Sequence, residues 1–177
     1  MSAGATQGGS GASIDAIRAG SPDALAELYT AYGAALFRLA YRLTGTHEDA
    51  EDVVHDVFVG LPEALSHYEE RGAFVGWLKR VTARVALMRL RRRGRRREVS
   101  LDAAEPATNP ASATDAIALQ AAVDALPHPL HSVLVLKEIE GYSHAEVGEL
   151  LGISGAASRV RLNRALRRLR TALENGR

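Results

Sequence analysis

The stretch from Ser143 to Arg170 constrains the fold of this chain more than any other part of it. Ser143 and Glu146 form a capping box, in which the hydroxyl and the carboxylate each satisfy an orphan amide at a helix start. Gly152 can take the left-handed conformation that ends a helix, and Ser154 can cap the next one. The pattern predicts a short helix, a tight turn and a second helix, which is the sequence form of a helix-turn-helix.

The second of these helices combines one apolar face with a cationic remainder. The apolar face carries Leu162, Leu166, Leu169 and Leu173, and the rest carries Arg159, Arg161, Arg164, Arg167, Arg168 and Arg170. An arginine-rich amphipathic helix is by itself as compatible with a solvated surface as with DNA. Because no acid interrupts the run from Arg159 to Arg170, and a cap and a glycine turn precede it, we favour DNA binding.

The composition favours helices and excludes several kinds of site. Of the 177 residues, 46% are hydrophobic and 5% aromatic, and alanine and leucine supply much of the apolar content. The chain contains no cysteine, which excludes disulfides and thiolate metal sites, and we expect a reducing, cytoplasmic environment. The sequence offers neither a signal-peptide pattern nor an apolar run long enough to span a membrane, so we expect no export and no membrane insertion.

The sequence of the N-terminal half predicts a helical domain over residues 13–97. We expect a disordered tail over residues 1–12, because these residues are too polar and glycine-rich to bury enough surface to offset the entropy lost on ordering. The first long helix begins after Ser21, followed by a proline that suits a first turn, and ends at Gly45. Thr46 is the expected cap of the next helix.

That next helix, which we expect to bend or end at Pro62, is strongly acidic. Its acids are Glu48, Asp49, Glu51, Asp52 and Asp56. The helix macrodipole favours acids in a first turn, but it does not explain Asp56. A cluster of acids would repel phosphate, so this face suits a protein partner.

The same helix places His47, Glu51 and His55 four residues apart, which is metal-ligand spacing. Side chains of this kind on an exposed acidic helix are usually only solvated, and no further ligand is evident in the sequence. A metal-dependent hydrolase would have to use these residues without a nucleophile, a phosphate-binding glycine loop or a pocket-forming sheet. We therefore expect no metal, no cofactor and no enzymatic activity.

A polar loop over residues 66–72 is expected to lead into a third helix from Gly72 to about Arg93. The bases on and just after this helix are Lys79, Arg80, Arg84, Arg89, Arg91, Arg92, Arg93, Arg95, Arg96 and Arg97, with no acid among them. Such a density indicates a phosphate-binding surface, the alternative being a localisation or membrane-surface patch. Phe74 and Trp77 fit the apolar stripe better than they fit base-stacking platforms.

Residues 98–115 are mostly small or polar and include prolines, which is typical of a linker. Beyond it, residues 116–177 predict a second helical domain, with helices over 117–126 and 130–139 broken at Pro127 and Pro129, ahead of the helix-turn-helix. The expected fold is therefore all-α, with two small helical domains joined by a flexible linker.

These segments resemble a known family. HEDAEDVVHDVF followed by GAFVGWLKRVTARVALMRLRRR is similar to the second conserved region of bacterial RNA polymerase sigma factors of the extracytoplasmic-function group. ALPHPLHSVLVLKEIEGYSHAEVGELLGISGAASRVRLNRALRRLR is similar to their fourth region. The resemblance covers about residues 14–97 and 116–173.

The resemblance implies a chain that binds core RNA polymerase and directs it to promoter DNA. Asp49, Asp52 and Asp56 would dock on the polymerase clamp, and the loop at 66–72 would lie near an unstacked base of the melted strand. The third helix would face the minus-ten element with Arg80, Arg84 and Met88, and Arg91 and Arg92 belong to its cationic surface. The minus-thirty-five element would be read in the major groove by Arg159, Val160, Asn163 and Arg164.

The chain departs from the family pattern at several reading positions. Arg84 stands where asparagine is common, Met88 stands where aspartate is common, and Ser158 replaces a branched apolar residue. The promoter sequence therefore does not carry over. Regulation by an anti-sigma factor is common in the group, but no residue here demonstrates it. The alternative function is an autonomous helix-turn-helix regulator, which has no evident need for the acidic helix.

Overall fold

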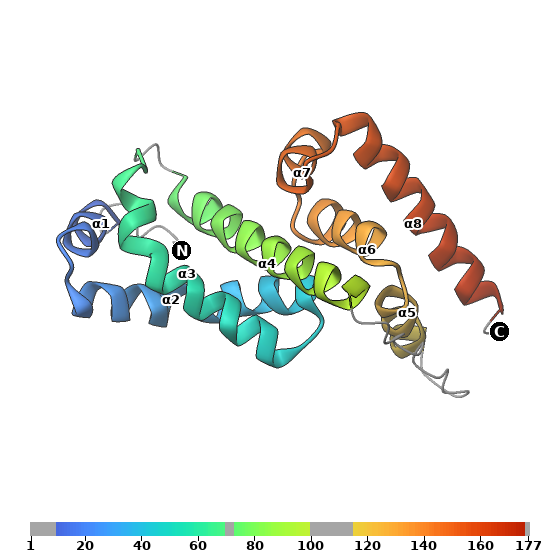
Figure 1. The fold of residues 1–177 in the computed structure, drawn as a ribbon, viewed down its shortest axis with the longest axis horizontal. Coiled ribbons are helices and arrows are strands. Elements are labelled where there is room, and N and C mark those ends of the chain that lie inside the picture. Colours follow the sequence, from blue (N-terminus) through green and yellow to red (C-terminus); the bar gives the residue numbers. More distant parts are fainter. Residues whose placement is uncertain (1–9, 70–72, 100–114, 176–177) are drawn as a thin grey trace, which may run out of the picture. The chain divides into compact units, whose positions relative to one another are not determined.

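The computed structural model describes residues 10–69, 73–99 and 115–175, and every regular element in these ranges is a helix (Figure 1). The chain divides into two compact units, residues 1–90 and 91–177, each of which is described here by itself. The expectation of an all-α fold is confirmed. Within the described residues, no helix is both long enough and apolar enough to cross a membrane.

The N-terminal unit is built from α1 (Ser10–Arg18), α2 (Pro22–Thr44), α3 (His47–Ser66) and α4 (Phe74–Val99), and α4 continues past the end of the unit. Helices α2 and α3 pack against each other, and α1 contacts both. The core consists of side chains that recur at helical spacing and are almost completely buried: Leu36, Leu39, Leu43, Val53, Val57, Leu61, Leu65 and Leu78.

The predicted helix boundaries around α2 and α3 are confirmed by the cap geometry. Ser21 Oγ accepts a hydrogen bond from the Ala24 amide, and Thr46 Oγ1 accepts one from the Asp49 amide. Gly45 has a φ of 80°, the left-handed conformation that ends α2. These contacts are local, so the sequence pattern alone was sufficient to predict them.

Two features of the N-terminal unit differ from the sequence prediction. Helix α1 includes residues 10–12, which were assigned to a disordered tail; residues 1–9 of that tail lie outside the described residues. The helix packs because Ile14 and Ile17 are buried against α2 and α3. Pro62 lies inside α3 and does not end it, since burial of Leu61 and Leu65 holds the last turns in place.

The C-terminal unit contains α5 (Asp115–Asp124), α6 (His128–Leu134), the π-helix η1 (Val135–Ile139), α7 (His144–Leu151) and α8 (Gly155–Asn175). Helix α8 packs on α5, α6 and α7. The expected break between these helices is present at Pro127, because α5 ends at Asp124 and α6 begins at His128. Pro129 does not break α6, because it occupies the first turn, where its missing amide costs nothing. Leu166 is 42% exposed, because Ala165 takes the inward position between Leu162 and Leu169.

The helix-turn-helix has the predicted geometry. The Ser143 amide donates to Glu146 Oε2 at 2.8 Å and Ser143 Oγ accepts from the Glu146 amide, which completes the capping box. Gly152 has a φ of 68° and ends α7, and Ser154 Oγ accepts from the Ala157 amide at 3.0 Å. A Cβ added to Gly148 would lie 2.6 Å from the Ile153 carbonyl oxygen, so the turn requires glycine at this position.

Candidate functional site

One face of α4, which we call its outer face, carries the residues that the resemblance assigns to the minus-ten element. Arg80, Arg84, Met88 and Arg91 recur every three or four residues and therefore share one face of the helix. Arg84, Met88, Arg91 and Arg92 are exposed, whereas Arg80 is half-buried. Met88 is 47% exposed, so this apolar side chain is available for contact with a ligand.

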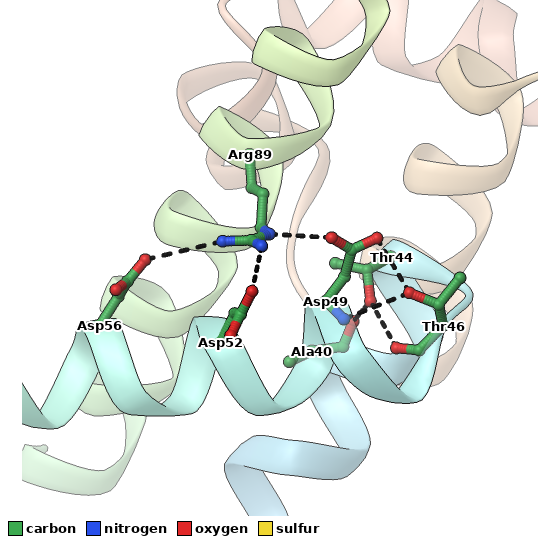
Figure 2. A network of polar contacts seen from close by, with 7 residues as sticks. All are labelled: Ala40, Thr44, Thr46, Asp49, Asp52, Asp56 and Arg89. Atoms are coloured by element: carbon green, nitrogen blue, oxygen red, sulfur yellow. Dashed lines mark hydrogen bonds and ion pairs between the residues drawn. The ribbon is translucent and has the colours of Figure 1, made fainter.

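The acidic face of α3 is occupied by an arginine that reaches across from α4 (Figure 2). Arg89 Nε donates to Asp49 Oδ1 at 2.9 Å, and Arg89 Nη2 donates to Asp52 Oδ2. Asp56 Oδ2 lies 4.0 Å from Arg89 Nη1. The hydrogen bond with Asp49 raises the pKa of Arg89 further above its ordinary value, so the guanidinium stays charged. The carboxylates of this face are thus partly neutralised within the unit itself.

Asp49 differs from the other two acids of this network in being committed to the fold. Its side chain is 15% exposed, against 49% for Asp52 and 58% for Asp56. Its second oxygen accepts a hydrogen bond from Thr46 Oγ1 at 2.9 Å, which links it to the cap of α3. Asp52 and Asp56 therefore retain surface for a partner, whereas the oxygens of Asp49 are taken up by Thr46 and Arg89.

A groove that sequence reasoning missed lies between α2 and α3. It has a volume of about 920 Å³ and is mostly apolar. Its lining includes Leu25, Tyr29, Gly33, Phe37, Val54, His55, Phe58 and Val59. Val59 is 66% exposed on α3 and lies three residues after Asp56, so the groove adjoins the acidic face. The signal that could have revealed it is the pair Val59 and Tyr29, two large apolar side chains that are 66% and 55% exposed.

The four residues assigned to the minus-thirty-five element lie together on α8. Arg159, Val160, Asn163 and Arg164 are all exposed. The opposite side of the helix is buried and is formed by Ser158, Leu162, Ala165 and Leu169. Within the described residues no ion pair involves the arginines of this helix. The exposed face is therefore strongly cationic.

The buried Ser158 is accommodated by a polar partner. Its Oγ lies 2.9 Å from Nδ1 of His144, the first residue of α7. A fully buried hydroxyl requires such a hydrogen bond, which explains how a serine replaces the apolar residue that the family pattern favours. This pair joins the two helices of the motif.

The histidines of α3 have neighbours that suit a solvated surface. His47 Nδ1 lies 3.4 Å from Glu51 Oε1, and His55 Nδ1 lies 3.9 Å from Asp56 Oδ1, with all four side chains exposed. In the part of the chain that the structure describes, no group of three or more histidine, aspartate or glutamate residues could hold a metal ion.

The aromatic residues before and within α4 form a cluster. Phe74 and Tyr68 are buried, with ring centroids 5.7 Å apart, and Trp77 lies 4.6 Å from Tyr68. Arg18 of α1 donates to the Leu65 and Tyr68 carbonyl oxygens beside this cluster, a contact that sequence reasoning missed. The core assignment of Phe74 is confirmed. Of the loop expected over 66–72, residues 70–72 lie outside the described residues.

Comparison with known proteins identifies the family. Residues 28–96 match Sigma-70 region 2, and residues 116–169 match Sigma-70 region 4. The chain is 36% identical to the ECF RNA polymerase sigma factor SigE of Mycolicibacterium smegmatis, over 83% of this chain and 60% of that protein. It is 30% identical to the ECF RNA polymerase sigma factor SigM of Mycobacterium tuberculosis, over 85% of this chain and 78% of that one.

A solved structure supports the same fold. The sigma factor RpoE from Bartonella quintana, crystallised with the anti-sigma factor NepR, matches with a TM-score of 0.63 at 22% identity, over 85% of this chain and 97% of that chain. The chain thus spans about 60% of the length of SigE and most of SigM and RpoE. Both conserved regions are present in the family's order, and the chain belongs to the sigma-70 family of RNA polymerase sigma factors, in its extracytoplasmic-function group.

Proposed function

We propose that this chain binds core RNA polymerase and directs it to promoters, and that it has no catalytic activity or cofactor of its own. The observation that carries the proposal is the segregation of charge within the N-terminal unit. Helix α3 presents Asp52 and Asp56, which repel phosphate, whereas α4 presents the exposed Arg84 on its outer face. A polymerase subunit requires two such faces, since it holds a protein and DNA at once.

The docking surface that we propose consists of Asp52, Asp56 and the groove beside them. Half-exposed carboxylates next to an exposed valine offer both charge and apolar area to a protein partner. Asp49, the third acid that the resemblance assigns to docking, contributes less to this surface, because its side chain is only 15% exposed and both of its oxygens contact Thr46 or Arg89. Because this surface would bind core polymerase, we propose that the chain acts in the cytoplasm.

Promoter reading is assigned to α4 and α8. Arg84 can donate to guanine or to phosphate, and Met88 can make only apolar contact, for example with a thymine methyl group. On α8, Arg159, Val160, Asn163 and Arg164 are proposed to enter the major groove, as the second helix of a helix-turn-helix does. An anti-sigma partner is also proposed, supported by the solved relative that carries one. An autonomous regulator is not favoured, since it leaves the acidic surface unused.

The test is reconstitution of the full chain with core polymerase, followed by mapping of the transcripts that start. We expect promoter-selective initiation with polymerase and only weak DNA binding by the free chain. The docking surface is tested with Asp52→Asn and Asp56→Asn together, because charge reversal would place new cations beside Arg89. Undiminished binding of the double variant to core polymerase would remove the docking assignment. Tight, sequence-specific DNA binding by the free chain would favour the regulator.

A further inference from the structure

Arg89 joins α4 to the acidic face of α3. It follows Met88 on α4, yet its guanidinium points to α3 and not to the outer face of its own helix (Figure 2). Asp49, Asp52 and Asp56 are spaced by three and four residues, so they line one side of α3. The planar fork of one arginine can therefore reach all three acids: it donates hydrogen bonds to Asp49 and Asp52, and Nη1 lies 4.0 Å from Asp56 Oδ2, a spread that a single ammonium group could not match.

The three contacts of Arg89 are unequal in a way that matters for a partner. The Asp49 contact is anchored, because that carboxylate is mostly buried and is also bonded to the Thr46 cap. The Asp52 and Asp56 contacts lie at the exposed edge of the network. The guanidinium, anchored by Asp49, thus also contacts two carboxylates that are about half exposed.

We propose that Arg89 is an internal occupant of the docking surface: in the free protein it holds Asp52 and Asp56, and core polymerase must engage them against its charge. This inference rests on the proposed docking of polymerase at these two acids. A polymerase cation that approaches them meets the positive charge of Arg89 and an oxygen of Asp52 that already accepts a hydrogen bond from it. The affinity of the free chain for polymerase is therefore lower than the acids alone would give.

The proposal predicts a sign opposite to that of a merely structural brace. If Arg89 only braces α4 on α3, then its removal loosens the unit and weakens polymerase binding. If it occupies the docking surface, its removal frees two acids and strengthens polymerase binding. Exposed ion pairs of this kind are weak, so two of them correspond to about a two- to tenfold gain in affinity.

The experiment measures the dissociation constant of the full chain and core polymerase, without DNA, for the wild type and for Arg89→Gln. We expect the variant to bind about two- to tenfold more tightly. Arg167→Gln is the charge-matched control, because Arg167 is an exposed arginine of α8 outside the docking surface and the reading positions. We expect it to bind like the wild type. A folded Arg89→Gln variant with equal or weaker binding overturns the proposal.

A second variant covers the case in which Arg89→Gln does not fold, as judged by circular dichroism at the binding temperature. Arg89→Lys keeps the charge near Asp49 but lacks the fork that reaches Asp52 and Asp56 together. We expect a smaller gain than for glutamine, but still tighter binding than wild type. Equal or weaker binding of the folded lysine variant would count against the occupant role.

The Asp52→Asn, Asp56→Asn double variant separates this inference from the proposed function. If it loses polymerase binding while the Arg89 variants gain none, the docking surface stands and the occupant role alone is wrong. If it binds undiminished, the docking assignment itself falls, and the inference falls with it. Adding Arg89→Gln to the double variant should give no further gain, because the acids that it would free are already gone.

Discussion

The two arginine-rich helices of this chain, α4 and α8, differ in what lies beside them. Arg89 of α4 faces an acidic helix and is held there by Asp49, Asp52 and Asp56. In α8 the buried side is almost entirely apolar, and its exposed arginines have no ion pair among the described residues. Similar composition therefore gives two different electrostatic surfaces.

The difference teaches that an arginine count does not measure a DNA-binding surface. Each arginine of α8 adds a charge that a phosphate can neutralise, so its DNA affinity should fall steeply with salt. In α4 one of the arginines, Arg89, belongs to the fold and to the proposed docking surface. An ion-pair network thus joins α4 to the acidic face of α3, whereas the arginines of α8 take part in no ion pair among the described residues.

The largest effect is expected from a substitution that disrupts the packing of α7 against α8 and leaves α4 unchanged. In Gly148→Ala the new Cβ would lie 2.6 Å from the Ile153 carbonyl oxygen, and backbone cannot move aside cheaply. We expect a loss of about 3 kcal/mol in the stability of the C-terminal unit. Amide hydrogen exchange of the full chain should show lost protection in α7 and α8, with α2 and α3 unchanged.

The control for that substitution is Gly155→Ala in the same motif. A Cβ at Gly155 would meet the His144 carbonyl oxygen at 3.5 Å, which is an ordinary contact. We expect unchanged protection. Equal loss in both variants would mean that helix packing, and not the close approach at Gly148, decides the stability of the turn.

The converse break targets the N-terminal unit through Asp49→Ala, which removes both the bond to the Thr46 cap and the anchor of Arg89. We expect a loss of about 2 kcal/mol, measured by denaturant unfolding. Glu48→Ala, an exposed acid in the same turn, should cost less than about 0.5 kcal/mol. Comparable losses would show that Asp49 acts only as a charge near the helix start.

A smaller effect, on sequence preference, distinguishes reading from phosphate binding on α8. Arg159→Ala and Asn163→Ala should each relax base preference at the minus-thirty-five element, by about 1–2 kcal/mol at the affected position. Arg168→Ala should weaken binding uniformly and reduce the salt slope, because it lies nearer the exposed end of the helix. A binding assay over randomised duplexes separates the two outcomes, and uniform loss in all three variants would contradict the assignment.

The smallest effect concerns pH and the C-terminal unit alone. Burial lowers the pKa of His131 below its ordinary value of 6.5, and His128 adds to this while Asp124 opposes it. The folded state therefore favours neutral His131, so stability is complete above pH 6.5 and falls as the pH drops toward the folded-state pKa. The protection factors of the α6 amides, corrected for the pH dependence of intrinsic exchange, should fall on acidification, and less so in His131→Gln. His128→Gln, at an exposed position, should retain most of the pH dependence.

Local chemistry made much of the fold predictable. Ser21, Thr46 and Ser143 act as caps through contacts only a few residues long, and Gly45 and Gly152 end helices where expected. These interactions depend on neighbouring residues, so the pattern contains all the information needed. The exposed face of α8 that we propose to read DNA is likewise predictable in part, because it lies opposite Leu162 and Leu169.

What could not be predicted depends on residues far apart in the chain. Arg89 and Asp49 are separated by 40 positions, and nothing in the sequence distinguished Arg89 from the neighbouring arginines. Helix α1 is stabilised by the burial of Ile14 and Ile17 against α2 and α3. The sequence alone does not show whether Ala165 or Leu166 faces inward. The packing of α8 buries Ala165 and leaves Leu166 exposed.

The close approach at Gly148 also bears on how promoter preference can change over evolution. The separation of α7 and α8 is set by main-chain atoms of Gly148, Ile153 and Gly155, and not by the side chains that we propose to face DNA. Substitutions at Arg159, Val160, Asn163 or Arg164 therefore leave the scaffold intact, because these residues are exposed and do not support it. If these residues read the promoter as we propose, a lineage can diversify its target sequences at these positions without compensating changes in the core.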